Sequence, residues 1–356
     1  MKNLDSQRDG DQAYKCKTIP EYLDKFKERS RQQSHLFEAA TIPVPQNKNS
    51  RIPEPTSTSK KTATKAVARI IQDDLFVTDL IDPNFRDEQD ILEAPMLSLD
   101  KRKRTQTIEF NGKNFFISVS ANSRYGMATI WDWDFMLWAG SQINEAIELN
   151  RPVGRTLHVR PNAYFIQTGK GSSKGQYTLF ESTLERLQST SIKTDIKADG
   201  KSYPEMFSWI DTWRAIRDLN GRLVYVEVTL SEWFFARVAA DRAVLSIDPA
   251  YFSITSGIKR WLYRIARKSA GSNADGWQFT ARQLHDRYPS GREFRKFKSD
   301  LKAAVLDDDL PEYRLQWVEG KDALVEIRPR PYTIRNRQVS RKRRLPNPPP
   351  AAQPLS

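Results

Sequence analysis

Alternating apolar and polar positions over residues 107–119 predict two short strands joined by a turn. The turn contains Asn111 and Gly112, and Asn-Gly is a strong hairpin signal because both positions tolerate positive φ. Apolar residues at helical spacing follow, and this stretch begins with Thr129 and Asp132. Their three-residue spacing is that of a capping box. We therefore expect a hairpin followed by an apolar helix.

Two more helices are predicted on either side of a glycine-rich turn at 168–175. The first covers 161–166. The second carries its apolar residues on one face, where the 3.6-residue period brings them together. These residues are Tyr177, Phe180, Leu184 and Leu187.

The second half of the chain repeats this plan with a different sequence. A strand is predicted at 222–228 because the run is rich in valine, leucine and tyrosine. Thr280 and Gln283 have capping-box spacing at the start of one helix, and Gly271 follows another as a C-terminal stop. The helices of this half are expected at 231–240, 253–269, 280–288 and 290–305, and strand-like runs follow at 313–318 and 323–327.

A helix, a short helix, a tight turn, a helix and a hairpin are, in that order, the elements of a winged helix-turn-helix. The expected fold class is therefore α+β, mainly helical, with tandem winged helix-turn-helix domains and disordered N-terminal and C-terminal tails. The predicted divisions are a linker tail at 1–70, a first winged-helix domain at 71–205, a second, DNA-reading one at 206–332, and a basic, proline-rich tail at 333–356.

Charge is distributed unevenly along the 356 residues, whose net charge is +13. Residues 1–70 carry 14 Lys/Arg and 8 Asp/Glu, and 328–344 carry 8 Lys/Arg and no acid, whereas 71–327 hold 35 basic and 36 acidic residues. Within that nearly neutral part, 255–305 hold 12 basic and 4 acidic residues. This local excess indicates an acidic partner. The cluster at 341–344 fits either a DNA-gripping arm or a solubilising tail.

The stretch SGREFRKFKSDLK at 290–302 separates apolar from basic positions. Ser290 and Glu293 have capping-box spacing, and Phe294, Phe297 and Leu301 share one direction. A recognition helix docks by such a stripe and presents its other face to the major groove; a solvated surface helix is the alternative. The residues expected to face the groove are Arg292, Arg295, Lys296, Ser299 and Lys302.

Further cations are expected at phosphates. These are Arg287, Lys321 in the turn of the last hairpin, and Lys170 and Lys174 in the glycine-rich turn. Glu181 and Glu185 on the exposed side of the following helix would repel DNA.

Several other activities find little support in the sequence. The spacing in 169–175 fails the phosphate-binding loop pattern, and the three histidines lie far apart without metal-ligand spacing. Cys16 is the single cysteine. No run of about 18 apolar residues occurs, and the N-terminus lacks the core of a signal peptide. We expect a soluble, intracellular, non-enzymatic protein, without cofactor, metal or membrane.

Five motifs resemble the plasmid replication initiator protein A family. They are RWLYRIARK at 260–268, DPAYF at 248–252, GMATIWD at 126–132, LERLQSTSI at 184–192 and LPEY at 310–313. The resemblance spans roughly 75–330 and implies tandem winged-helix domains related to iteron-binding initiators.

The resemblance further implies a protein that binds repeated sequences in double-stranded plasmid origin DNA, promotes duplex opening, and recruits the host initiation ATPase and replicative helicase. In related initiators a homodimer represses its own gene and a monomer initiates. Two alternatives stay open, namely a winged-helix transcriptional repressor without a replication role and a strand-nicking replication enzyme. Scattered histidines argue against the nicking enzyme.

Overall fold

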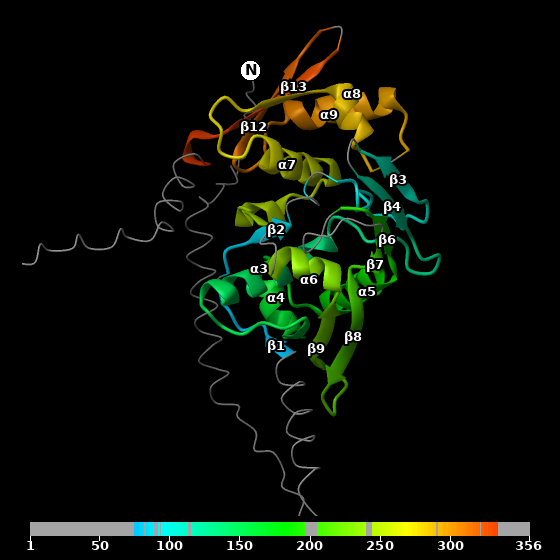
Figure 1. Cartoon of the computed structure of the whole chain (residues 1–356), viewed down its shortest axis with the longest axis vertical. Coiled ribbons are helices and arrows are strands. Elements are labelled where there is room, and N and C mark those ends of the chain that lie inside the picture. The colour runs from blue at the N-terminus through cyan, green and yellow to red at the C-terminus, as the bar shows by residue number, and fades with distance from the viewer. Residues whose placement is uncertain are drawn as a thin grey trace, which may run out of the picture. The chain divides into compact units, whose positions relative to one another are not determined.

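The computed structural model describes residues 75–81, 83–88, 92, 94–112, 115–196, 205–239, 244–289, 291–320 and 322–333, all within one compact unit (Figure 1). The helices are α3 (Trp133–Glu148), α4 (Pro161–Gln167), α5 (Lys174–Ser189), α6 (Glu232–Ala239), the 3-10 helix η1 (Pro249–Ser253), α7 (Gly257–Ser269), α8 (Ala281–Asp286) and α9 (Phe294–Leu306). The strands are β1 (Leu75–Val77), β2 (Arg86–Glu88), β3 (Ile108–Asn111), β4 (Phe116–Ser120), β5 (Thr156–Val159), β6 (Ser191–Thr194), β7 (Glu205–Ser208), β8 (Ile210–Arg217), β9 (Leu223–Leu230), β10 (Val244–Ser246), β11 (Trp277–Thr280), β12 (Tyr313–Val318) and β13 (Leu324–Pro329).

The expectation of a mainly helical fold of tandem winged helix-turn-helix domains is wrong. Strands β1 to β13 form four sheets, in the orders β1-β5-β9-β8, β10-β2, β11-β13-β12 and β3-β4-β6-β7. Strand β1 lies parallel to β5, and every other pairing is antiparallel. Many of these strands are only three or four residues long, too short for a period-2 pattern to stand out in the sequence.

The sheet β1-β5-β9-β8 brings together segments that are distant in the sequence. Leu157 in β5 pairs with Val228 in β9, and both side chains are buried. Strands β8 and β9 are a long hairpin, whose tip lies away from α9 (Figure 1). The predicted boundary between residues 205 and 206 falls inside β7, and this sheet contains β1 and β5 from before it and β8 and β9 from after it. The division into two domains there stays a prediction.

The predicted hairpin around Asn111 and Gly112 is present as β3 and β4. Asn111 pairs with Phe116, and Gly112 N donates to the Phe115 carbonyl at 2.8 Å. Strand β6 continues the sheet beyond β4, with Ile192 opposite Val119. The hairpin is therefore present as predicted, but Asn111 is the last residue of β3, and neither Asn111 nor Gly112 has the positive φ on which the Asn-Gly signal rests.

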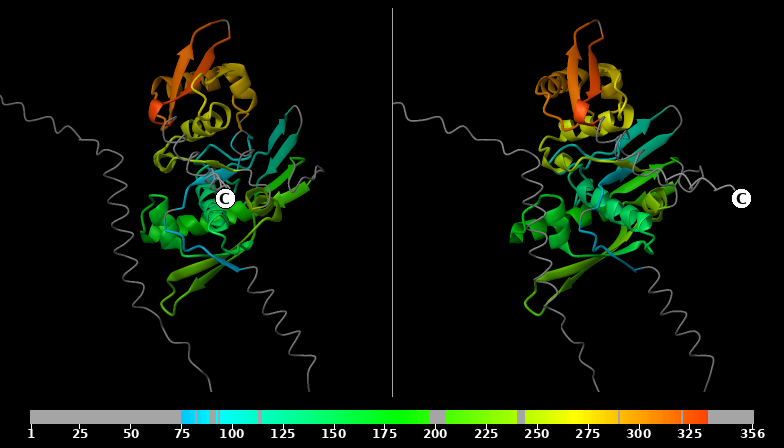
Figure 2. Two further views of the ribbon diagram at one scale, coloured as in Figure 1. Left: turned by 60° about the vertical axis from the view of Figure 1, so that its left-hand side comes forward. Right: turned by 90° about the vertical axis from the view of Figure 1, so that its left-hand side faces the viewer.

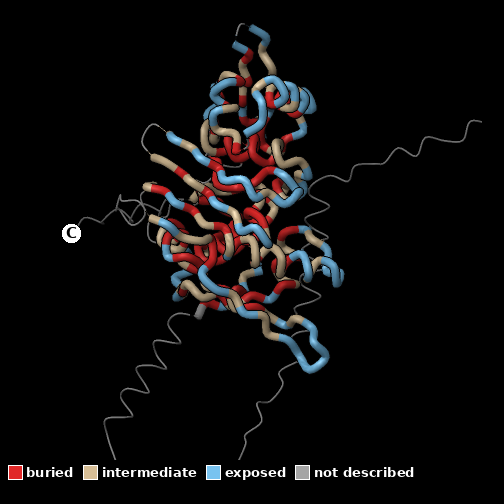
Figure 3. Tube along the Cα trace, turned by 90° about the vertical axis from the view of Figure 1, so that its right-hand side faces the viewer, coloured by how far each residue is buried: buried red, intermediate tan, exposed pale blue. Residues whose placement is uncertain are grey.

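Helix α3 is the centre of the core. Thr129 N donates to Asp132 Oδ2 at 2.8 Å, and Asp132 N donates to Thr129 Oγ1 at 3.2 Å, which confirms the reciprocal capping bonds. The helix itself begins at Trp133, and nearly all its side chains are buried. Figure 3 shows buried residues running through the interior of the described chain.

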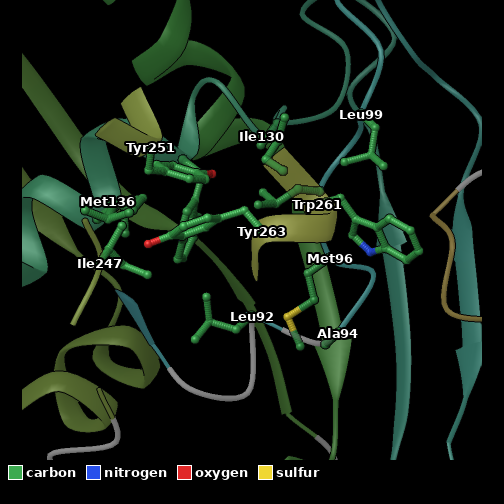
Figure 4. Packing of buried hydrophobic residues seen from close by; sticks show 14 of the residues in the cluster. Leu92, Ala94, Met96, Leu99, Ile130, Met136, Ile247, Tyr251, Trp261 and Tyr263 are labelled. Carbon is green, nitrogen blue, oxygen red and sulfur yellow. The ribbon is translucent and has the colours of Figure 1, made fainter. Parts of the chain in front are cut away.

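The core extends without interruption from α3 to α7. Figure 4 shows Tyr251 and Tyr263 close to Met136 and Ile247. The Tyr251 and Tyr263 rings have centroids 5.3 Å apart. Because one hydrophobic cluster includes residues of both helices, α7 belongs to the same packed interior as α3.

Elements α7, β11, α8, α9, β12 and β13 follow one another in the predicted order of helices and hairpin, with β11 in addition. Strand β11 pairs with β13, which also pairs with β12, and the three strands lie beside α9 (Figure 2). The capping box of Thr280 and Gln283 is confirmed at the start of α8. The helix predicted at 253–269 begins only at Gly257, after η1 has ended at Ser253, and the one predicted at 290–305 begins only at Phe294.

Candidate nucleic-acid interface

Helix α9 is anchored by the apolar stripe that the sequence indicates. Phe297, Leu301 and Val305 are at most 1% exposed. The Phe297 ring lies 4.7 Å from that of Tyr288 and 6.3 Å from that of Trp261, centroid to centroid. Burying such side chains contributes about 1.5 to 3 kcal/mol each, so the rotation of α9 about its axis is well determined.

The opposite face of α9 is open to solvent. Arg295, Lys296 and Ser299 are exposed, as is Arg292 just before the helix. Lys296 Nζ lies 3.7 Å from Glu293, and Arg292 Nη2 lies 3.1 Å from Asp300. Within the described part of the chain, the side chains of Arg295 and Ser299 form no ion pair or hydrogen bond.

The two ion pairs at this face do not prevent binding of an anion. Arg292 and Asp300 have side chains 44% and 42% exposed, and exposed pairs contribute about 0 to 1 kcal/mol. A phosphate can therefore replace either carboxylate at little cost.

The start of α9 differs from the prediction. Ser290 lies outside the described residues, and Glu293 is the N-cap without a side-chain capping bond. The His285 Nε2 atom lies 2.8 Å from the Arg292 carbonyl oxygen, so α8 holds the backbone immediately before α9. The backbone of Arg292 is therefore held in place next to the exposed basic face of α9.

Lys302 is directed along the protein rather than outward. Its Nζ donates to Glu319 Oε1 at 2.5 Å and lies 5.8 Å from the centre of the Trp317 ring. The hydrogen bond from Lys302 lowers the pKa of Glu319. Lys302 thus connects α9 to the end of β12, which positions the hairpin.

The other predicted phosphate ligands have different surroundings. Arg287 is half-buried, stacks 5.4 Å from the Phe279 ring centre and donates to the Gln283 carbonyl at 3.4 Å. Lys321 lies outside the described residues. Lys174 is exposed at the first position of α5, far along the chain from α9.

Lys170 is half-buried, and its ammonium group is paired with a buried acid instead of being free in an open turn. Its Nζ donates to Asp134 Oδ2 at 2.8 Å, and Asp134 is fully buried. Arg260 Nη1 donates to the other oxygen of the same carboxylate at 2.6 Å. Glu181 on α5 is paired with Arg217 of β8, so its charge is partly neutralised. The structure does not bring Lys170 and Lys174 together with the α9 face as one surface.

The comparison with protein families decides how the chain is classified. The family model for replication initiator protein A matches residues 86–315. The chain belongs to the replication initiator protein A family. This membership assigns the protein to the initiators of DNA replication and, within them, to plasmid replication. The resemblance carried by the five motifs is confirmed.

One relative has a name that concerns replication. A protein of Wigglesworthia glossinidia brevipalpis named "Putative replication protein" is 29% identical over 245 residues, which cover 68% of this chain and 88% of that one. Among solved structures, two of domains 2 and 3 of RctB align with 12% and 13% identity and TM-scores of 0.48 and 0.45. Each alignment covers 67% of this initiator, and 95% and 96% of the respective RctB chain.

Three arginines of the local basic excess are inside the initiator, which the sequence reasoning missed. Arg260, Arg264 and Arg267 on α7 are at most 8% exposed. Arg264 Nη2 lies 3.3 Å from Asp87 Oδ2, and burial raises the pKa of Asp87. The spacing of these arginines on one side of α7 was the signal in the sequence. It could not reveal their burial, because a solvated face and a buried ionic face have the same periodicity.

The described residues also bear on metal binding and on membrane insertion. No group of three or more His, Cys, Asp or Glu side chains in these ranges is arranged to hold a metal ion. None of the helices resolved in them is long and apolar enough to cross a membrane.

Proposed function

We propose that this family member initiates plasmid replication by binding repeated sequences in double-stranded origin DNA through the exposed face of α9. The observation that carries the proposal is a rigidly anchored helix whose free side presents Arg292, Arg295, Lys296 and Ser299. An α-helix fits the major groove, where Arg reaches the guanine O6 and N7 atoms and Lys and Ser reach bases or phosphates.

The distribution of charge supports a DNA contact at α9 and not over the whole surface of the protein. The part of the chain from 71 to 327 is nearly neutral, and Arg260 and Arg264 are paired with buried acids. Arg292, Arg295 and Lys296 at α9, in contrast, are exposed. Good base contacts each contribute about 1 to 3 kcal/mol of discrimination, so two or three are enough to select a repeat.

The further steps of the proposal follow the family. After binding, the initiator promotes opening of the adjacent duplex and recruits the host initiation ATPase and replicative helicase in the bacterial cytoplasm. A homodimer of the protein represses its own gene. No enzymatic step and no cofactor are required, because the cellular machinery supplies strand separation and synthesis.

Arg295→Ala tests the DNA contact. We expect the variant to lose discrimination between origin and random duplexes by about 10- to 100-fold, the equivalent of one base contact. Arg222→Ala is the matched control, since Arg222 is an exposed arginine in the turn between β8 and β9. Equal discrimination by parent and Arg295→Ala would remove α9 from the reading role.

A replication assay tests the biological role. The gene and its flanking DNA are joined to a circle that does not replicate alone. We expect the circle to be maintained with the parent gene and lost with Arg295→Ala. A protein that binds the flank yet never sustains the circle would instead be a repressor, the alternative reading of the same binding surface.

A further inference from the structure

A second basic element lies beside the start of α9. Residues Lys101, Arg102, Lys103 and Arg104 follow one another immediately before β3. The first three are exposed and Arg104 is half-buried. Arg104 and Pro289 are 185 residues apart in the sequence, yet Arg104 Nη1 donates to the Pro289 carbonyl at 2.5 Å. Pro289 lies in the segment that leads into α9.

The basic loop is held in a defined conformation. Met127 N donates to the Arg104 carbonyl at 2.9 Å, and Lys103 Nζ donates to the Arg124 carbonyl at 3.1 Å. Gly126 has a φ of +85°, and a Cβ there would lie 2.8 Å from Lys103 Cγ. These contacts hold the backbone of the loop and the Lys103 side chain in place before any ligand arrives.

The charges of this loop are available to a ligand. Lys101 Nζ lies 5.3 Å from the centre of the Trp131 ring, and exposed Arg124 adds a further cation. Among the described residues, Lys101, Arg102 and Lys103 form no ion pair with an acid. The nearest acidic neighbour in sequence, Asp100, is itself exposed and acts on Arg104, whose pKa burial lowers.

We propose that Lys101 and Arg102, supported by Arg124, contact backbone phosphates beside the groove that α9 reads. A helix in the major groove brings the turn before it over the phosphate backbone that borders the groove. Because the hydrogen bond from Arg104 joins the loop to the turn before α9, the loop would lie beside the same DNA phosphate backbone as that turn. This inference rests on the proposed function of α9 and adds a sequence-independent contact from a different part of the chain.

Replacing the two exposed cations tests the loop. For Lys101→Gln with Arg102→Gln, we expect equal weakening on origin and random duplexes, with their affinity ratio unchanged. Each phosphate contact adds about 0.9 to the slope of log affinity against log salt. A fourfold rise in salt should therefore weaken the parent about tenfold more than the double variant.

The control removes two cations elsewhere. Arg214→Gln with Arg222→Gln takes the same charge from the β8–β9 hairpin, where Arg214 makes only a 3.6 Å pair with Glu227. This control should keep the salt slope of the parent. Arg102→Glu alone serves as a second variant, because the exposed Arg102 side chain forms no hydrogen bond, ion pair or ring contact among the described residues whose loss could unfold the loop.

Phosphate ethylation interference locates the contact. The parent should show sensitive phosphates flanking the bases protected by α9, and these should vanish in the loop variants. If loop variants and parent share one salt slope while Arg295→Ala loses discrimination, the loop proposal fails and the α9 proposal stands. If the parent binds no duplex DNA at all, the proposed function fails first.

Discussion

Replacing Arg260 by Ala should strongly destabilise the protein, because the guanidinium is buried between α7 and α3. Its side chain is 2% exposed. Nη1 donates to Asp134 at 2.6 Å, and Nε and Nη2 donate to the carbonyls of Ile254 and Phe252 at 2.7 and 3.0 Å. The substitution leaves three acceptors in the interior without these donors.

The expected loss of unfolding free energy follows from the carboxylate of Asp134, which stays buried in the variant. Removing one partner of a buried ion pair costs about 3 to 5 kcal/mol. Asp134 retains the bond from Lys170 at 2.8 Å, so we expect the lower end, about 3 kcal/mol of unfolding free energy. At about 2 to 4 °C per kcal/mol for a domain of this size, the melting temperature should fall by about 6 to 12 °C.

Urea unfolding followed by tryptophan fluorescence measures this loss, provided that the transition is single. Arg222→Ala is the control and should change the unfolding free energy by less than about 0.5 kcal/mol. An Arg260→Ala protein within about 1 kcal/mol of the parent would refute the reasoning that this pair holds α7.

Three further outcomes are expected. Gly276→Ala should destabilise the sheet of β11 by more than about 1 kcal/mol in urea unfolding, because φ is +73° and a Cβ would lie 2.2 Å from the Ile327 carbonyl oxygen; an unchanged midpoint would contradict this. Thr280→Ala should cost about 1 kcal/mol by losing the α8 capping box, and Thr280→Ser should restore most of it. Burial lowers the pKa of His158, so the unfolded state takes up the proton first, and stability present above about pH 6.5 is lost as pH falls. His158→Gln should lose less unfolding free energy than the parent on acidification, and parallel pH profiles would exclude this origin.

Local features were predictable because they depend on neighbours in the sequence. The reciprocal bonds of Thr129 and Asp132, and the capping box at Thr280, involve residues three positions apart. The apolar stripe of α9 follows from helical periodicity alone, and Phe297 and Leu301 are buried as expected. Such features need only short-range geometry, so one sequence contains the information.

Pairing between distant strands was not predictable in the same way. Strand β2 pairs with β10 across more than 150 residues, and β5 pairs with β9 across about 70. Strands β7 and β8 follow each other closely yet belong to different sheets. The mainly helical expectation failed because short strands become stable only when their partners arrive from elsewhere in the chain.

The sequence by itself determined the family, the order of the helices α7, α8 and α9 and of the hairpin β12–β13, and the basic and apolar faces of α9. Only the tertiary structure decided which cations are free. Lys170 and Arg260 converge on the buried carboxylate of Asp134, whereas Arg102 is exposed in a loop that Arg104 bonds to the turn before α9. The sequence gives the number and positions of the charged residues. Whether a cation can bind a ligand depends on its burial and on the acidic partners that folding brings from distant positions.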